Sequence, residues 1–480
     1  MTPAHAKASN AILPEGFAQA LAHVCSKNTL ITDSDSMQRF LIEERSLFTS
    51  NAEIVVAPST AQEVSRIISL CAQWEVPVVP QGGNTGLVGG TVAGRGEVLM
   101  SLQKLNRILE VDAENFTITV EAGCILADVQ KAASDVGCFF PLSLGAEGSC
   151  TIGGNIASNA GGIGVLKYGN TRELTLGLEV ILSDGRIWNG MRPLYKDNTG
   201  YSLKNLFIGS EGSLGIVTKA ILKLYPAHIQ RKKAFCALNS PRDALTLLAL
   251  ARKRSGDDVT AFELMSRFSL EIVTKHTDNN EPFSESYPWY ALIEFSTSRT
   301  GNDLELLFEA FAEEAFETGL ILDAVVAQSV DQEQRLAALR ESIPEAQKKA
   351  GGSIKHDVSV PVSKVPDLIE KASAAVLALI PDAKICAFGH VGDGNVHFNV
   401  TQPDGADRKV FLERWDDVNA VVYEATTQLG GSISAEHGIG LLKVYEINHY
   451  RDPVEGELMR TIKAALDPYN IMNPGKLVAS

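Results

Sequence analysis

Short apolar runs predict mainly strands in the first half of the chain. Residues 54–57 are typical of a strand, and Thr60 caps a segment to about Trp74 in which apolar residues recur at helical spacing. Further predicted elements are strands over 76–80, 98–102 and 117–121, and a helix over 126–136. These strands alternate with stretches that are unusually rich in glycine.

Helical patterns take over after residue 226. Helices are predicted over 244–253, 303–317, 365–379 and 462–466, and strands over 289–295 and 321–327. Interleaved helices and strands of this kind predict an α+β domain. With Tyr225-Pro226 as the boundary, the chain divides into residues 1–226 (core 45–226), 227–430 and a C-terminal segment, 431–480.

Composition narrows the class of protein. A chain of 480 residues, 45% hydrophobic and 21% charged, is typical of a soluble protein of two or three domains. Its net charge of -15 argues against nonspecific binding to nucleic acid or anionic lipid. No apolar run is long enough to span a bilayer, and Met1 to Lys7 lack the features of a signal peptide. We therefore expect no transmembrane segment and a cytoplasmic location.

The seven cysteines are scattered and contain no Cys-x-x-Cys pair. Such spacing predicts buried thiols in a reducing compartment rather than disulfides or an iron–sulfur site. They are Cys25, Cys71, Cys124, Cys138, Cys150, Cys236 and Cys386.

Three glycine-dense stretches fall within one region of the chain. The first, residues 81–90, has five glycines in its last nine residues, and the others cover 144–162 and 209–218. Exposed backbone N–H groups in such a loop can hold a diphosphate, but the spacing matches neither a Rossmann turn nor a Walker loop. One such stretch alone could be a surface loop. Three together suggest a long ligand lying against exposed backbone.

These stretches, with the segment Lys196 to Tyr201, resemble the FAD-binding domain of the vanillyl-alcohol oxidase type. The resemblance implies that the first loop holds the pyrophosphate and that the later stretches line the ribityl chain and isoalloxazine. Many relatives with covalent flavin carry histidine where this chain has Asn84, so we expect noncovalent FAD. The resemblance also implies that the C-terminal segment returns to the flavin domain.

The resemblance assigns FAD contacts to a set of mostly small residues. They are Pro80, Gly82, Gly83, Asn84, Thr85, Gly86, Leu87, Pro141, Gly145, Ser149, Thr151, Gly153, Gly154, Asn155, Ser158, Asn159, Gly161, Glu211, Gly215, Ile216, Val217 and Asn473.

A second chemical feature is the stretch 389–399, read as strand, tight turn and strand. Its His390 and His397 are seven residues apart and can share a divalent metal, although surface histidines on an Asp-Gly hairpin are the alternative. Glu436 lies in a glycine-flanked stretch and completes a set of two histidines and one carboxylate. Zinc is the expected ion, with manganese or iron as alternatives. Otherwise Glu436 simply pairs with a cation.

Candidate groups for acid–base chemistry and anion binding lie nearby. A free imidazole titrates near neutral pH, which suits His437 as a general base. Arg340 and Lys355 are candidate anchors for a substrate carboxylate, with ordinary surface cations as the alternative. Strand alternation places His356 on the opposite face from Lys355.

From about residue 40 to its end the chain resembles the D-2-hydroxyglutarate dehydrogenases and their D-lactate dehydrogenase relatives. The resemblance implies metal ligands at His390, His397 and Glu436. It implies substrate contacts at Arg340, Lys355, Asn399 and His437. Where the hydroxyglutarate enzymes often carry a threonine or serine, four residues after the arginine, this chain has Pro344. Proline has no hydroxyl to donate to a distal carboxylate, and this affects the choice of hydroxyglutarate over malate or lactate.

The expected fold is a two-subdomain FAD-binding domain with an α+β substrate domain. The expected activity is an FAD- and metal-dependent dehydrogenase that oxidises a D-2-hydroxy acid to the 2-oxo acid, by hydride transfer to flavin N5. D-2-Hydroxyglutarate is the favoured substrate and D-malate is an alternative. Other hypotheses are a D-lactate or glycolate dehydrogenase subunit and a non-catalytic flavin-binding subunit. The expected electron acceptor is an electron-transfer flavoprotein or a quinone, and a homodimer is one possible assembly.

Overall fold

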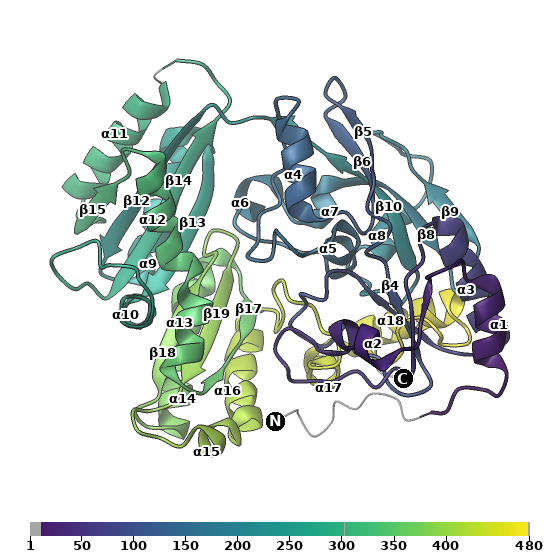
Figure 1. The fold of residues 1–480 in the computed structure, drawn as a ribbon. Coiled ribbons are helices and arrows are strands. Elements are labelled where there is room, and N and C mark those ends of the chain that lie inside the picture. The colour runs from purple at the N-terminus through teal and green to yellow at the C-terminus, as the bar shows by residue number, and fades with distance from the viewer. Residues whose placement is uncertain (1–10, 302, 479–480) are drawn as a thin grey trace. The chain divides into compact units, whose positions relative to one another are not determined.

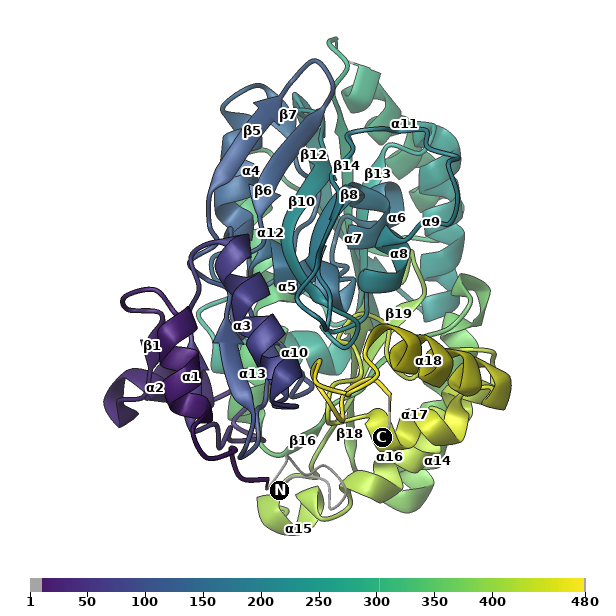
Figure 2. The same ribbon diagram turned by 90° about the vertical axis from the view of Figure 1, so that its right-hand side faces the viewer.

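The fold is that of a computed structural model, which describes residues 11–301 and 303–478 (Figures 1 and 2). The expectation for Met1 to Lys7 lies outside these residues. The chain forms two compact units. The N-terminal unit contains the described residues up to Gly161, then Gly169–Pro226, and the chain from Glu436 on. The central unit contains Gly162–Tyr168 and Ala227–Ala435.

The first sheet of the N-terminal unit has the order β1-β2-β4-β3. Its strands are β1 (Leu30–Ile31), β2 (Ile54–Val56), β3 (Val78–Gln81) and β4 (Val98–Ser101), and β2, β4 and β3 run parallel. Helix α3 (Ala61–Gln73) connects β2 to β3 and begins where the Thr60 side chain accepts a hydrogen bond from the Glu63 N–H. Its apolar face, including Val64 and Ile67, is buried with α1 (Phe17–Val24) in the core of this unit.

The second sheet of this unit is antiparallel, with the order β5-β6-β10-β8-β9. Its strands are β5 (Ile108–Asp112), β6 (Thr117–Glu121), β8 (Thr175–Ile181), β9 (Ile187–Gly190) and β10 (Ile216–Lys223). Helix α5 (Ile152–Ser158) packs against β10 and β6. The short strands β7 (Cys138–Phe139) and β11 (Tyr225–Pro226) pair with each other. Other helices are α2 (Ser34–Leu41), α4 (Leu126–Ser134), α7 (Thr171–Leu174) and α8 (Lys204–Phe207).

The C-terminal segment returns to the first sheet. After α17 (Val444–Tyr450) and α18 (Pro453–Leu466), the chain passes along β3. The Val78 N–H donates to the Ile471 carbonyl at 2.7 Å, and the Asn473 N–H donates to the Val78 carbonyl at 2.9 Å. The last residues of the chain are therefore part of the same core as the first strands.

The central unit is built on one antiparallel sheet with the order β15-β12-β14-β13-β18-β19-β16, with β17 also paired to β19. Its strands are β12 (Gln230–Leu238), β13 (Val259–Ser266), β14 (Trp289–Thr297), β15 (Asp323–Val326), β16 (Ser353–Ile354), β17 (Asp357–Ser359), β18 (Lys384–Gly389) and β19 (Asn395–Thr401).

Helices of the central unit cover both faces of this sheet. Leu292 lies in the core formed with α10, α12 and α13, whereas Phe295, of opposite parity on β14, packs on Phe308 and Phe311 of α11. The helices are α6 (Val165–Tyr168), α9 (Pro241–Ser255), α10 (Arg267–His276), α11 (Asp303–Glu317), α12 (Val330–Glu341), α13 (Ile343–Ala350), η1 (Val362–Lys364), α14 (Val365–Leu379), α15 (Arg408–Leu412) and α16 (Trp415–Gln428).

Two boundaries differ from those set by the sequence pattern. Residues 162–168 belong to the central unit, although their neighbours in sequence belong to the N-terminal unit. In the central unit, Lys167 pairs with Asp258 at 3.0 Å. The central unit extends to Ala435 rather than 430, since the Ser432 N–H donates to the Ser359 carbonyl at 2.8 Å.

Two global features follow from the described residues. None of their helices is long and apolar enough to cross a membrane. All seven cysteines are free thiols; Cys25 is half-buried and the other six are buried.

Candidate functional site

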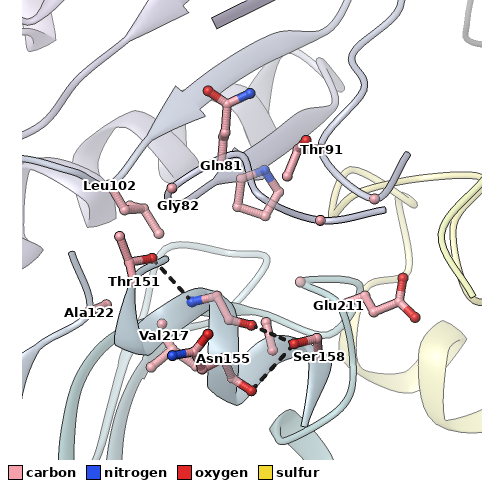
Figure 3. Close-up of a pocket in the computed structure, with 18 of the residues that line it drawn as sticks. Gln81, Gly82, Thr91, Leu102, Ala122, Thr151, Asn155, Ser158, Glu211 and Val217 are labelled. Carbon is pink, nitrogen blue, oxygen red and sulfur yellow. Dashed lines mark hydrogen bonds between the residues drawn. The ribbon is translucent and has the colours of Figure 1, made fainter. Parts of the chain in front are cut away.

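A cavity in the N-terminal unit lies where the three glycine-dense stretches meet (Figure 3). It contains about 1000 Å³ free of protein atoms, open solvent at its mouth included. The first stretch follows β3, the second leads into α5, and the third leads into β10. Figure 3 shows Gly82 of the first stretch across the cavity from Asn155 and Ser158 of α5. Backbone therefore forms much of the wall.

Glycine is required where the first stretch meets the second. A Cβ on Gly83 would lie 2.0 Å from the Ser149 carbonyl oxygen, and one on Gly82 would lie 2.3 Å from the Thr151 Oγ1. Side chains at these positions would force the stretches apart. The third stretch is tied to the second by backbone, since the Glu211 N–H donates to the Ala157 carbonyl at 2.8 Å.

Most of the residues expected to contact FAD line this cavity. They are Pro80, Gly82, Gly83, Asn84, Thr85, Gly86, Thr151, Gly153, Gly154, Asn155, Ser158, Glu211, Gly215, Ile216 and Val217. Seven others do not line it: Leu87, Pro141, Gly145, Ser149, Asn159, Gly161 and Asn473. Further lining residues lacked a sequence signal of their own, among them Gln81, Thr91, Leu102, Ala122, Cys150, Phe207 and Ser210.

Some of the seven support the wall from behind. Asn473 donates from Nδ2 to the carbonyl oxygens of Gly90 and Glu211, at 3.0 and 2.6 Å, and so joins the first and third stretches. Ser149 presents its carbonyl to Gly83. These residues shape the cavity without facing it.

Asn84 has a left-handed backbone, with φ of 59°, at the turn of the first stretch. Its Nδ2 donates to the Ile42 carbonyl at 2.7 Å, and its Oδ1 accepts from the Thr91 hydroxyl at 2.8 Å. Both ends of the amide are therefore bound to protein groups that hold the loop.

His437 also lines the cavity, and the carboxylate of Glu211, another lining residue, fixes the chain beside it. The Glu211 carboxylate accepts hydrogen bonds from the N–H groups of Ile439 and Gly440, at 2.7 and 2.8 Å. Gly438 has φ of 82°, and a Cβ there would lie 2.8 Å from Glu211 Oε1. His437 Nε2 lies 3.8 Å from Glu436 Oε1. Glu211 thus determines where the Glu436-His437 pair enters the N-terminal unit.

In the central unit, His390 and His397 are both buried beside the turn between β18 and β19. Their ring centroids are 5.8 Å apart, in an edge-to-face arrangement. His390 Nδ1 forms a very short hydrogen bond with Glu263 Oε1. His397 Nδ1 lies 3.8 Å from Asp357 Oδ1. Each histidine therefore has a carboxylate next to one ring nitrogen, the arrangement typical of metal-binding histidines.

Glu263 and Asp357 gave no signal in the sequence. Glu263 is 1% exposed on β13, and its Oε2 also accepts from Arg340 Nε at 2.7 Å. Burial alone raises the pKa of the Glu263 carboxyl, but the interactions with His390 and Arg340 outweigh burial and lower that pKa to about 2. The carboxylate is thus charged and acts only as an acceptor.

Asp357 connects the histidine pair to the end of the central unit. Asn395 donates from Nδ2 to Asp357 Oδ1 at 2.9 Å, and the Ala435 N–H donates to the Asp357 carbonyl at 3.2 Å. Glu436 is the next residue along the chain. Asp393 shapes the turn, since its Oδ1 accepts from the Asn395 N–H.

Lys355 and His356 occupy the break between β16 and β17. His356 is 2% exposed and Lys355 half-buried, so their side chains take opposite faces. Asn399 accepts from the His356 N–H at 3.1 Å and donates to Gln347 Oε1 at 2.9 Å. The Asn399 amide therefore fixes the backbone beside Lys355.

Comparisons with known proteins match two consecutive parts of the chain. Residues 52–190 match the "FAD binding domain" family, and residues 228–477 match "FAD linked oxidases, C-terminal domain". The D-2-hydroxyglutarate dehydrogenase of Xanthomonas citri pv. viticola is 40% identical over 434 residues, covering 90% of each chain. The mitochondrial D-2-hydroxyglutarate dehydrogenase of Arabidopsis thaliana is 38% identical over 456 residues, covering 95% of this chain and 80% of the relative.

The chain belongs to the FAD-linked oxidase family. The predicted FAD-binding domain and the assignment as an oxidoreductase are thereby confirmed. The fold class is confirmed as well, because p-cresol methylhydroxylase superposes with a TM-score of 0.77 over 97% of this chain and 98% of that one, at 18% identity. In this FAD-linked oxidase, much of the cavity wall is glycine backbone. Side chains at these positions would occupy the space, so the cavity as it stands fits a dinucleotide.

The first prediction concerns Gly83. Substitution Gly83→Ala places a methyl group against the Ser149 carbonyl, and overpacking of this kind costs about 1–3 kcal/mol. We expect FAD affinity to fall by about tenfold to a hundredfold, measured by flavin retention on dilution. Gly148→Ala is the matched control, because a Cβ there meets nothing within 4 Å. Equal flavin loss in both variants would contradict the role of this contact.

The second prediction concerns Glu211. In Glu211→Gln, an NH₂ group replaces one carboxylate oxygen and cannot accept the hydrogen bond from the backbone N–H that it faces. Leaving that N–H without an acceptor costs about 1–3 kcal/mol of stability. We expect faster hydrogen exchange at Ile439 and Gly440. Glu63→Gln is the control, since Glu63 also accepts from backbone N–H groups, those of Ser26 and Ser59. Unchanged exchange at residues 439 and 440 in Glu211→Gln would refute the assignment.

Proposed function

We propose that this FAD-linked oxidase is a divalent-metal-dependent dehydrogenase that converts a D-2-hydroxy acid into the 2-oxo acid, with D-2-hydroxyglutarate as the favoured substrate. The observation that carries the proposal is the buried group in the central unit, where His390 binds the carboxylate that also binds Arg340 and lies edge-to-face with His397. Relatives 38–40% identical over most of the chain are named D-2-hydroxyglutarate dehydrogenases, which supports the substrate.

His390, His397 and Glu436 would hold the metal. Glu263 holds His390 by Nδ1, so Nε2 is the ring nitrogen that would bind an ion. Two histidines and one carboxylate leave a coordination position open and suit zinc, with manganese as an alternative. When bound, such an ion lowers the pKa of a hydroxyl that it coordinates.

His437 would accept the hydroxyl proton. It lines the FAD cavity and directly follows Glu436, a proposed metal ligand, with Nε2 3.8 Å from Glu436 Oε1. When bound, FAD supplies flavin N5 as the acceptor of the Cα hydride. The two substrate electrons thus leave with the hydride, and the proton leaves through His437.

Arg340 and Lys355 would anchor substrate carboxylates. Burial raises the pKa of the Cys386 thiol, and the charges of Lys355 and Arg340 act on that pKa in the opposite direction. Both cations therefore lie around one part of the central unit. Asn399 would support them, because its side chain accepts a hydrogen bond from the His356 N–H and so fixes the backbone next to Lys355. Pro344 lies exposed in the first turn of α13 and offers no hydroxyl to a distal carboxylate. This difference favours D-malate or D-lactate as the competing substrates.

The proposal includes noncovalent FAD and an external electron acceptor. The Asn84 side chain is bound to Ile42 and Thr91 and has no nucleophile for a flavin bond. An electron-transfer flavoprotein or a quinone would reoxidise the flavin. Denaturation should release all FAD into the supernatant.

The third prediction tests the substrate. Under anaerobic conditions, D-2-hydroxyglutarate should bleach the flavin absorbance and its L-enantiomer should not, because only one enantiomer presents its Cα hydride to the ring. D-malate, D-lactate and glycolate are measured in parallel. Faster reduction by D-lactate or glycolate would replace the proposed substrate. Failure of every acid to reduce the flavin would support a non-catalytic flavin-binding subunit.

The fourth prediction tests the metal. Removal of bound metal by a chelator should abolish turnover while FAD stays bound, and added Zn²⁺ or Mn²⁺ should restore it. His397→Ala should lose the metal, measured by elemental analysis. His276→Ala is the control, because His276 lies in the same unit at the end of α10. Full activity in protein shown to be free of metal would exclude the metal's role.

A further inference from the structure

Glu263 is a buried charged residue, and no sequence pattern marked its position as part of a functional site. It lies in the middle of β13, opposite Leu292 of β14, on the sheet face that packs against α10, α12 and α13. Burying a carboxylate is unfavourable unless partners satisfy both of its oxygens. The identity of its partners therefore indicates what the charge is for.

The two oxygens of Glu263 bind groups from two other elements. Oε1 contacts Nδ1 of His390, which follows β18, and Oε2 accepts from Nε of Arg340, in the last turn of α12. Strand pairing brings these elements together, because Leu264 of β13 pairs with Gly389 of β18. The Arg340 guanidinium also lies over the Phe388 ring, 4.7 Å from its centroid. One carboxylate thus joins a histidine and an arginine that are far apart in sequence.

We propose that Glu263 is a positioning residue that aligns His390 for metal binding and Arg340 for the substrate carboxylate at the same time. This inference rests on the proposed function. It adds a residue that fixes the spacing between the two points at which a 2-hydroxy acid would be held. Glu263 itself touches neither substrate nor cofactor.

The contact with His390 selects one form of the imidazole. Glu263 already accepts from an arginine, so its other oxygen also acts as an acceptor, and Nδ1 of His390 must carry a hydrogen. The lone pair of the neutral ring is then on Nε2, where it can bind a cation. Loss of this acceptor would allow the opposite tautomer, in which Nε2 carries the hydrogen and cannot bind a metal.

The contact with Arg340 determines which edge of the guanidinium can bind a substrate carboxylate. Nε is bound to Glu263 and the plane is stacked on Phe388, so the side chain cannot rotate freely. Within residues 11–301 and 303–478, its two terminal nitrogens donate to no other group. They present a two-pronged donor that matches a carboxylate.

A shared carboxylate has a consequence for specificity. If His390 and Arg340 are both held by Glu263, the distance between the metal and the guanidinium is fixed by one short, buried group. A fixed distance discriminates between 2-hydroxy acids by the position of their second carboxylate. A monocarboxylic acid such as D-lactate cannot use this spacing.

The test is Glu263→Gln, measured on the FAD-loaded enzyme. The amide can accept from only one of its two partners, and its NH₂ group faces the other. We expect the affinity for Zn²⁺, measured by competition with a chelator, to fall by about 10- to 100-fold. We also expect the kcat/KM ratio for D-2-hydroxyglutarate over D-lactate to fall by about tenfold, through KM for the dicarboxylate. FAD content should not change.

Two further variants separate positioning from simple stability. Glu294→Gln is the matched control, because Glu294 is a largely buried glutamate, 14% exposed, on the same sheet face, paired with Lys233 and Arg231. It should lower the melting temperature without altering Zn²⁺ affinity or the substrate ratio. Arg340→Lys should reproduce the substrate effect and leave Zn²⁺ affinity within about twofold of wild type.

The outcomes distinguish this inference from the proposed function. Glu263→Gln behaving like Glu294→Gln, with wild-type Zn²⁺ affinity and substrate ratio, would overturn the positioning role while leaving the dehydrogenase intact. A wild-type enzyme that binds no Zn²⁺ or Mn²⁺ and oxidises no 2-hydroxy acid would instead overturn the proposed function. Loss of Zn²⁺ affinity and of the substrate ratio together, in Glu263→Gln alone, is the result that supports the inference.

Discussion

The N-terminal unit depends on one constraint, the approach of peptide backbone to peptide backbone at Gly83 and Ser149. At 2.0 Å from a hypothetical Cβ to the Ser149 oxygen, no side chain other than hydrogen fits. This contact holds the loop after β3 against the stretch that leads into α5, and Glu211 joins the third stretch to the end of α5. The FAD cavity is the space that remains between these three segments.

Each unit uses a glutamate carboxylate to position a histidine. In the N-terminal unit, Glu211 binds the N–H groups of Ile439 and Gly440, two and three residues after His437. In the central unit, Glu263 binds the His390 ring directly. The two arrangements differ in what they control. Glu211 sets the path of the backbone and leaves the imidazole of His437 at the cavity wall, whereas Glu263 sets the tautomer and orientation of a side chain.

The sequence predicted the features that recur within a short window. Apolar periodicity located α11 and the cap of α3, and glycine density located the FAD cavity. It missed Glu263, because the partners of this residue lie 77 and 127 positions away and a single charged residue in a strand forms no pattern. The place of residues 162–168 in the central unit was missed for a related reason: its contacts there, such as Lys167 with Asp258 and the Tyr168 hydroxyl with His228, join residues far apart in the sequence. The assigned metal and substrate contacts stay predictions.

The backbone next to Lys355 is held by polar side chains of β19 and α13. A break between β16 and β17 would leave the His356 N–H without a partner, and Asn399 accepts from it at 3.1 Å. Gln347, which is fully buried on α13, in turn accepts from Asn399 and donates to Thr401 at 3.2 Å. Because an amide nitrogen has two hydrogens, Asn399 holds Gln347 with one of them, and the substrate contact proposed for Asn399 would use the other. An aliphatic residue of the same size could make neither hydrogen bond.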